Sequence, residues 1–138
     1  MHLIEFELRE IQMKEEGLGS RQIIVLGEKD GEREFPIIIG FAEALALDLD
    51  LHGYVYPRPM THDLIFNVME GLKAELKHVV VDDLRDGTFF GKLVVRTADD
   101  TEEWIDSRPS DAIVLATKKK VPIYVNEQIL ERILNENE

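Results

Sequence analysis

Cysteine is absent from this sequence of 138 residues. Disulfides, zinc–thiolate sites, iron–sulfur clusters and thiol nucleophiles are therefore excluded. The four histidines are scattered, with no pair at a spacing such as H-x-x-x-H, so a histidine-rich zinc site within one chain is not expected. No apolar run approaches the roughly 20 residues that a membrane span needs. The N-terminus lacks the basic start and apolar core of a signal peptide, so we expect a cytoplasmic protein without a membrane partner.

Basic residues are also few, with 16 Lys and Arg against 28 Asp and Glu, which gives a net charge of −12. Tight, sequence-independent binding of nucleic acid needs many cations to neutralise phosphates, so any binding of DNA or RNA is predicted to be weak. The motifs G-x-x-x-x-G-K, G-x-G-x-x-G and G-x-S-x-G do not occur either. We therefore expect no organic cofactor, although carboxylates could still hold a divalent metal ion.

The length and the apolar content of 44% predict one domain over residues 1–138 with a buried core. Alternating or apolar runs predict strands, two of the turns between them are Asp-Gly hairpins, and 3.6-residue periodicity predicts helices. The fold class is α+β, with a mixed, mostly antiparallel sheet built from hairpins, at least one parallel strand pair, and three to four packed helices. The expected strands cover residues 2–13, 22–28, 33–39, 76–84, 88–96, 102–105 and 122–125. The expected helices cover residues 41–52, a segment from 61, a segment from 109 and a terminal segment through 134.

Three local patterns lead to further expectations about packing. The run 37–39 is Ile-Ile-Ile, apolar on both faces, which favours a central strand. The helix from 61 is expected to have Thr61 as its N-cap and an inner stripe of Leu64, Ile65, Val68 and Leu72. The helix 41–52 is apolar over more than half its girth, which predicts burial between layers or in a subunit contact of a homo-oligomer.

The first motif that could carry chemistry is Arg58-Pro59-Met60-Thr61-His62-Asp63-Leu64. A turn bounded by prolines delivers Arg58, His62 and Asp63 to a helix start, where free N–H groups and the helix dipole favour anions. Arg58 could hold a phosphate and His62 could act as a general acid or base. In the structural alternative, Thr61 caps the helix, Asp63 complements its dipole and Arg58 pairs with a nearby carboxylate.

The second motif, Asp106-Ser107-Arg108-Pro109-Ser110-Asp111, has a similar plan of strand end, Arg-Pro, hydroxyl, acid and helix. Asp106 and Asp111 lie five residues apart across the turn and could converge on Mg²⁺ or Mn²⁺, which would activate water against a phosphodiester. Alternatively, a serine caps the helix and Arg108 pairs with an aspartate. The shared chemistry of the two motifs favours a joint site.

A third feature is Glu43, which lies in the first turn of the otherwise apolar helix 41–52. Buried acids need a partner, so Glu43 is expected to face Arg58, Arg108 or solvent. A role in dipole stabilisation and a role in substrate binding both remain open.

Five blocks of residues occur in order along the chain, at 36–44, 58–64, 86–90, 106–113 and 121–125. Together they resemble the bifunctional nuclease family, and the resemblance runs from about residue 4 to 134. It implies a small, oligomeric α+β domain found in bacterial, archaeal and plant proteins, whose plant members cut both DNA and RNA. The candidate functional residues by motif match are Glu43, Arg58, His62, Asp63, Asp106, Arg108, Ser110 and Asp111.

Two functions are therefore kept open. In the first, a nuclease, Asp106 and Asp111 hold the metal ion with Asp63 as a further ligand, the two motif arginines hold the phosphate, and His62 transfers a proton. In the second, a non-enzymatic oligomeric binding or regulatory module, both Arg-Pro motifs form an ion-pair network that locks helices together. A third possibility is a small-molecule anion site at the same helix starts.

Overall fold

The protein is described here from a computed structural model, which covers residues 1–16 and 19–136. Among these residues the chain forms four helices and a mixed sheet of seven strands, which confirms the predicted α+β class. The strands are β1 (Leu3–Glu16), β2 (Gly19–Glu28), β3 (Glu34–Ile39), β4 (Glu75–Arg85), β5 (Thr88–Arg96), β6 (Glu102–Ser107) and β7 (Ile123–Asn126). The helices are α1 (Phe41–Leu51), α2 (Thr61–Gly71), α3 (Pro109–Lys119) and α4 (Glu127–Glu136).

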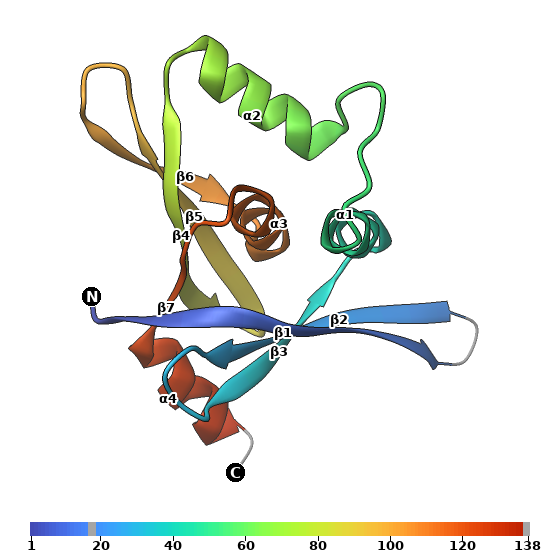
Figure 1. The fold of residues 1–138 in the computed structure, drawn as a ribbon. Coiled ribbons are helices and arrows are strands. Elements are labelled where there is room, and N and C mark those ends of the chain that lie inside the picture. The colour runs from blue at the N-terminus through green and yellow to red at the C-terminus, as the bar shows by residue number, and fades with distance from the viewer. Residues whose placement is uncertain (17–18, 137–138) are drawn as a thin grey trace.

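The strand order in the sheet is β3-β2-β1-β7-β4-β5-β6. Two antiparallel meanders, β1–β3 and β4–β6, are joined through the short strand β7, which pairs antiparallel with β1 and parallel with β4. In Figure 1, α1, α2 and α3 lie together above the β1–β2 ribbon, whereas α4 lies below it. None of the described helices combines the length and apolarity that crossing a membrane would require.

The prediction that the Ile-Ile-Ile strand is central was wrong, because β3 forms an edge of the sheet. Phe35, Ile37 and Ile39 are buried in the core, but Ile38 is 59% exposed. Pro36 in the middle of β3 fits an edge position, since proline has no N–H to donate to a second neighbouring strand.

Helix α2 begins one residue earlier than expected, because its N-cap residue is Met60 rather than Thr61. The Asp63 carboxylate accepts a hydrogen bond of 3.1 Å from the Met60 N–H. Three of the four residues of the predicted inner stripe were wrong, because Leu64, Val68 and Leu72 are 54%, 53% and 69% exposed. Ile65 packs against the core as predicted, together with Phe66 and Met69. The helix carries two adjacent apolar stripes, and periodicity alone does not decide which of them faces inward.

The core lies between the sheet and the helices and includes Leu47 of α1 and most of α3. Ala112, Ile113, Val114, Leu115 and Ala116 of α3 are all at most 1% exposed. Helix α1 packs against α3, so its buried residues are Glu43, Ala44 and Leu47, while Phe41 and Leu51 remain exposed. This packing sets the N-terminus of α3 beside the N-terminal half of α1, where the candidate site lies.

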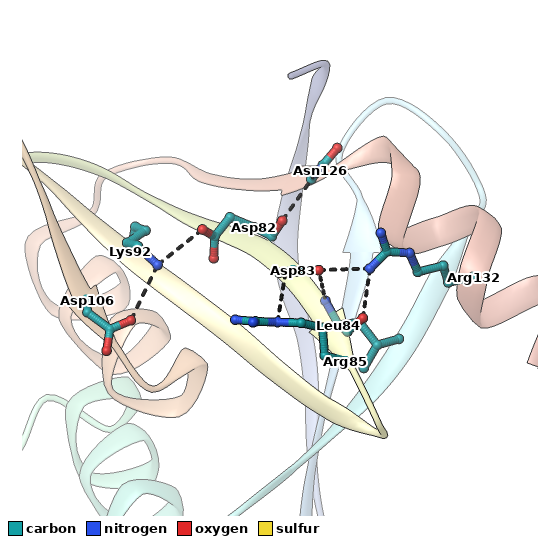
Figure 2. Close-up of polar contacts among 8 residues, drawn as sticks. All are labelled: Asp82, Asp83, Leu84, Arg85, Lys92, Asp106, Asn126 and Arg132. Carbon is teal, nitrogen blue, oxygen red and sulfur yellow. Dashed lines mark hydrogen bonds and ion pairs between the residues drawn. The ribbon is translucent and has the colours of Figure 1, made fainter.

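The C-terminal helix is fixed to the sheet by polar contacts (Figure 2). Asn126 accepts a hydrogen bond from the Gln128 N–H at the start of α4, and its amide donates to the Asp82 carbonyl. Arg132 donates to the Asp83 carboxylate and to the Leu84 carbonyl, both at 2.8 Å. These contacts hold α4 away from the site formed by the other three helices.

Candidate functional site

The starts of α2 and α3 lie next to each other, although the two motifs are about fifty residues apart in the sequence. Each start follows extended backbone: the N-cap residues are Met60 (φ −81°, ψ 175°) and Arg108 (φ −66°, ψ 142°). Pro109 is the first residue of α3, where its missing N–H costs nothing and its fixed φ suits the helix. The two helix starts therefore lie close enough for their side chains to interact, and a joint functional site there stays a prediction.

A continuous chain of polar contacts links three helices at this site. His62 Nε2 of α2 lies 3.0 Å from Asp111 Oδ1 of α3. The other oxygen of Asp111 accepts a hydrogen bond of 3.1 Å from Arg108 Nε. Arg108 Nη2 then donates to Glu43 Oε1 of α1. The four side chains form one network, in which each contact restricts the orientation of the next.

Glu43 is the buried end of this network, with a side chain only 8% exposed. A buried carboxylate needs a partner, and Arg108 supplies it, which is one of the partners expected from the sequence. The Asp111 and Glu43 carboxylates raise the pKa of Arg108 above its ordinary value, so the guanidinium remains charged. Gly40 makes room for Glu43: a Cβ at Gly40 would overlap the Glu43 carboxylate, although the backbone there is ordinary extended chain.

The network lines a cavity of about 630 Å³, which we call the main cavity. Its apolar wall comes from residues that include Ile65, Leu93 and Leu115. Of the eight candidate residues, five line it: Glu43, His62, Asp106, Arg108 and Asp111. The His62 side chain is 12% exposed and Asp111 is 30% exposed, whereas Arg108 is 68% exposed. A volume of this size lies within the roughly 300–1,000 Å³ typical of small-ligand sites.

Asp106 lines the main cavity, but its carboxylate does not meet that of Asp111. It is 83% exposed and pairs with Lys92 at 3.3 Å, and Lys92 also binds Asp82 at 3.2 Å (Figure 2). Lys92 neighbours Leu93 in β5, and consecutive strand residues point to opposite faces, so the Asp106 carboxylate faces away from α3. Burial acts to lower the pKa of Lys92, but the Asp82 and Asp106 carboxylates outweigh it and raise the pKa.

Asp63 lines a second cavity, of about 350 Å³, which His62 also lines. Lys118 lies 3.1 Å from Asp63 and 3.7 Å from Asp50, which joins the end of α3 to α1 and α2. Burial acts to raise the pKa of Asp63, but the Met60 N–H, Lys118 and the field of His62 together lower it below its ordinary value.

The remaining two candidates, Arg58 and Ser110, lie outside the polar network. Arg58 belongs to the exposed loop that joins α1 to α2, lines neither of the two cavities, and has no polar partner within residues 1–16 and 19–136. Ser110 is 8% exposed in the first turn of α3. Among the described residues, neither side chain forms a hydrogen bond or ion pair with His62 or Asp111.

Residues 24–137 of the chain match the bifunctional nuclease domain family. The chain belongs to this family. Uncharacterized proteins from two strains of Mycobacterium tuberculosis are 38% identical to it over 124 residues, which make up 90% of this chain and 73% of each relative. Proteins named bifunctional nuclease 1 from Oryza sativa and bifunctional nuclease from Oryza minuta are 30% identical over 109 residues. The matched region is 77% of this chain and 33% of each rice protein.

In this bifunctional nuclease domain, the network is suited to move a proton and to bind an anion. Asp111 accepts the hydrogen of His62 Nε2, which leaves Nδ1 as the basic nitrogen. The Nη1 group of Arg108 has no polar partner in the described part of the chain and is available to a phosphate oxygen. The described residues contain no group of three or more His, Asp or Glu side chains placed to hold a metal ion. A metal ion on Asp106 and Asp111 therefore stays a prediction, and binding it there would require both side chains to leave their present partners.

Lys92 and Lys118 were not among the candidate residues of this bifunctional nuclease domain. Lys118 lies in the last turn of α3, where a basic residue complements the helix dipole. Its pairing with two acids from other helices depends on tertiary packing, and the sequence contains no local signal for it.

Proposed function

We propose that this domain hydrolyses phosphodiester bonds of DNA and RNA in the main cavity. The observation that carries the proposal is the placement of His62 in the cavity wall, oriented by Asp111, with Arg108 fixed beside it. The matched family and the names of its rice relatives support the same class of reaction. We also place the protein in the cytoplasm as a homo-oligomer, with weak binding of nucleic acid because of its net charge of −12.

In the proposed reaction His62 is the general base. Its Nδ1 takes a proton from a water molecule, the water oxygen forms a bond to phosphorus, and the P–O bond to the leaving oxygen breaks. The leaving oxygen takes its proton from solvent. Arg108 binds a non-bridging phosphate oxygen, and Asp111 stabilises the imidazolium that forms, as an orienting acid does in other base–acid pairs.

The roles of the other candidates are also proposals. Glu43 fixes Arg108 through their buried pair, Ser110 lies at the first turn of α3, and Arg58 contacts the nucleic acid backbone from the loop. Mg²⁺ or Mn²⁺ on Asp106 and Asp111, with Asp63 nearby, would supply further charge neutralisation at the phosphate. Dependence on a metal ion is tested by comparing activity in either ion with activity in EDTA.

The proposal is tested with the wild type and His62→Gln, Asp111→Asn and the double variant, purified identically, on single- and double-stranded DNA and RNA. General base catalysis is worth about 10²–10⁴ in rate, so His62→Gln should lower kcat by that factor. Since the two residues act as a unit, the double variant should be no slower than His62→Gln alone. Asp100→Asn is the matched control, because this side chain is 85% exposed and lines neither cavity. Equal cleavage by wild type and His62→Gln would contradict the proposal and indicate a contaminating nuclease.

The alternative function, an oligomeric binding module, is favoured by a different observation. The network connects α1, α2 and α3 and so could serve only to hold these helices together. The outward-facing side of α2 carries the exposed apolar residues Leu64, Val68 and Leu72. In that case Asp111→Asn should lower the melting temperature or the mass measured by light scattering, and no variant or substrate should show metal-dependent cleavage. Unchanged mass and melting temperature with lost cleavage would exclude it.

A further inference from the structure

The second cavity, beside His62, contains features that the proposed reaction does not use. The α1–α2 loop lines it with every residue from Tyr54 to Pro59 except Arg58, and the helices contribute Leu49 and Asp50 of α1, Asp63 and Asn67 of α2, and Lys118 of α3. It shares Ala46, Met60 and His62 with the main cavity, so the two cavities adjoin at these residues. A ligand bound to Arg108 in one cavity could therefore extend into the other.

The loop presents a pair of aromatic rings to this cavity. The rings of Tyr54 and Tyr56 pack edge to face with centroids 4.8 Å apart, and the two residues are 57% and 37% exposed. Tyr54 N–H donates to the Leu49 carbonyl at 2.9 Å, which anchors the start of the loop to α1. Pro57 and Pro59 limit the backbone further on, because the proline ring fixes φ. The rings are thus held in place before any ligand binds.

The charge of the second cavity disfavours a phosphate and favours a neutral group with hydrogen-bond donors. Asp50 and Asp63 face the single cation Lys118, so these side chains carry a net charge of −1. Carboxylates accept hydrogen bonds from the exocyclic amino groups of bases, as they do from N4 of cytosine. Aromatic rings stack on the faces of unpaired bases.

We propose that the second cavity binds one unpaired nucleobase next to the scissile phosphate. The base stacks on the exposed Tyr54–Tyr56 pair, and its exocyclic amino group donates to Asp50 or Asp63. The substrate class is therefore single-stranded nucleic acid, with a preference for adenine, cytosine or guanine over thymine or uracil, which lack that amino group. This inference rests on the proposed function, because it takes the phosphate to lie in the main cavity.

The test uses three fluorescent single strands of equal length with phosphorothioate linkages, which resist cleavage: one of adenine, one of thymine and one without bases. Their dissociation constants are measured by fluorescence anisotropy at low salt for the wild type, Tyr54→Leu/Tyr56→Leu and Trp104→Leu. The last variant is the matched control, because Trp104 is an aromatic side chain of β6 that is 42% exposed and lines neither cavity. Cleavage of ordinary oligonucleotides by the wild type is measured in parallel.

Stacking of one base should make the wild type bind the adenine strand roughly five- to 150-fold more tightly than the strand without bases. The double tyrosine variant should lose this difference, and Trp104→Leu should keep it. Equal binding of the adenine strand and the strand without bases by the wild type would overturn the inference even if the tyrosine variant did not fold. If the wild type cleaves but shows no dependence on bases, only the base site fails. Base-dependent binding without cleavage would support the site and refute the proposed hydrolysis. Binding of no strand at all would refute both.

Discussion

Removal of the Arg108 guanidinium is expected to destabilise the fold more than its surface position suggests. Arg108 is 68% exposed, but its partner Glu43 is only 8% exposed. In Arg108→Ala, the Glu43 carboxylate stays buried without a counter-charge. Breaking a fully buried ion pair in this way costs about 3–5 kcal/mol, and access of water through the vacated position should reduce the cost to about 2 kcal/mol. For a chain of this length the melting temperature should fall by roughly 6–8 °C.

The effect should be asymmetric between the two partners. Glu43→Gln leaves a solvated arginine and a neutral buried amide, so it should cost about 0.5 kcal/mol. The double variant Glu43→Gln/Arg108→Ala has no buried charge. Its free energy of unfolding should therefore be about 1 kcal/mol higher than that of Arg108→Ala. Urea titration of all three variants at pH 7 measures these differences in the free energy of unfolding.

Arg96→Ala is the matched control for this prediction. Arg96 also pairs with two carboxylates, Glu75 at 2.7 Å and Asp100 at 3.8 Å, but their side chains are 46% and 85% exposed. A surface pair of this kind contributes about 0–1 kcal/mol. If Arg108→Ala costs no more than Arg96→Ala, or if Glu43→Gln does not relieve it, the buried-charge argument is wrong.

Three further predictions follow from single positions. Gly40→Ala should displace the Glu43 carboxylate and destabilise the protein by about 1–3 kcal/mol in urea titration; a loss below 0.5 kcal/mol would show that the side chain moves freely. Leu47→Ala should cost about 2–5 kcal/mol because Leu47 is 0% exposed, and a smaller loss would mean that α1 collapses onto the space. The lowered pKa of Asp63 means that its contribution to stability is complete above the unfolded value of about 3.9 and is lost as the pH falls through the folded value. The difference between the wild type and Asp63→Asn should therefore be constant from about pH 5 to 7 and shrink below about pH 4, and a difference that grows on acidification would contradict this sign.

The order of elements and the hairpins could be predicted because their signals are local. Asp-Gly turns, alternating strands and Pro109 at a helix start each depend on a few neighbouring residues. The position of β3 at the sheet edge could have been predicted from Pro36, but the apolar Ile-Ile-Ile run was given more weight. The sequence could not predict which of the two apolar stripes of α2 faces the core. That choice depends on the path of the preceding loop and on the packing of α2 against α3.

The sequence names the side chains that meet at the two helix starts, but their contacts could not be predicted from it. A buried acid on an apolar helix needs a cation, so Arg108 was one of the expected partners of Glu43, and the structure selects it. The contact between His62 and Asp111 joins two helices distant in sequence and depends on the packing of α2 over α3. The direction of the Asp106 carboxylate is set by the pairing of β5 with β6, which places it opposite Lys92.

The position of β7 has a consequence for the order in which the protein can fold during synthesis. β1 and β4 are made early, yet the strand that lies between them is completed only at Asn126. Until the ribosome has released that residue, the two meanders have no shared hydrogen bonds and each presents an open strand edge, which can pair with other chains. The four residues of β7 then close both open edges when they pair with β1 and β4.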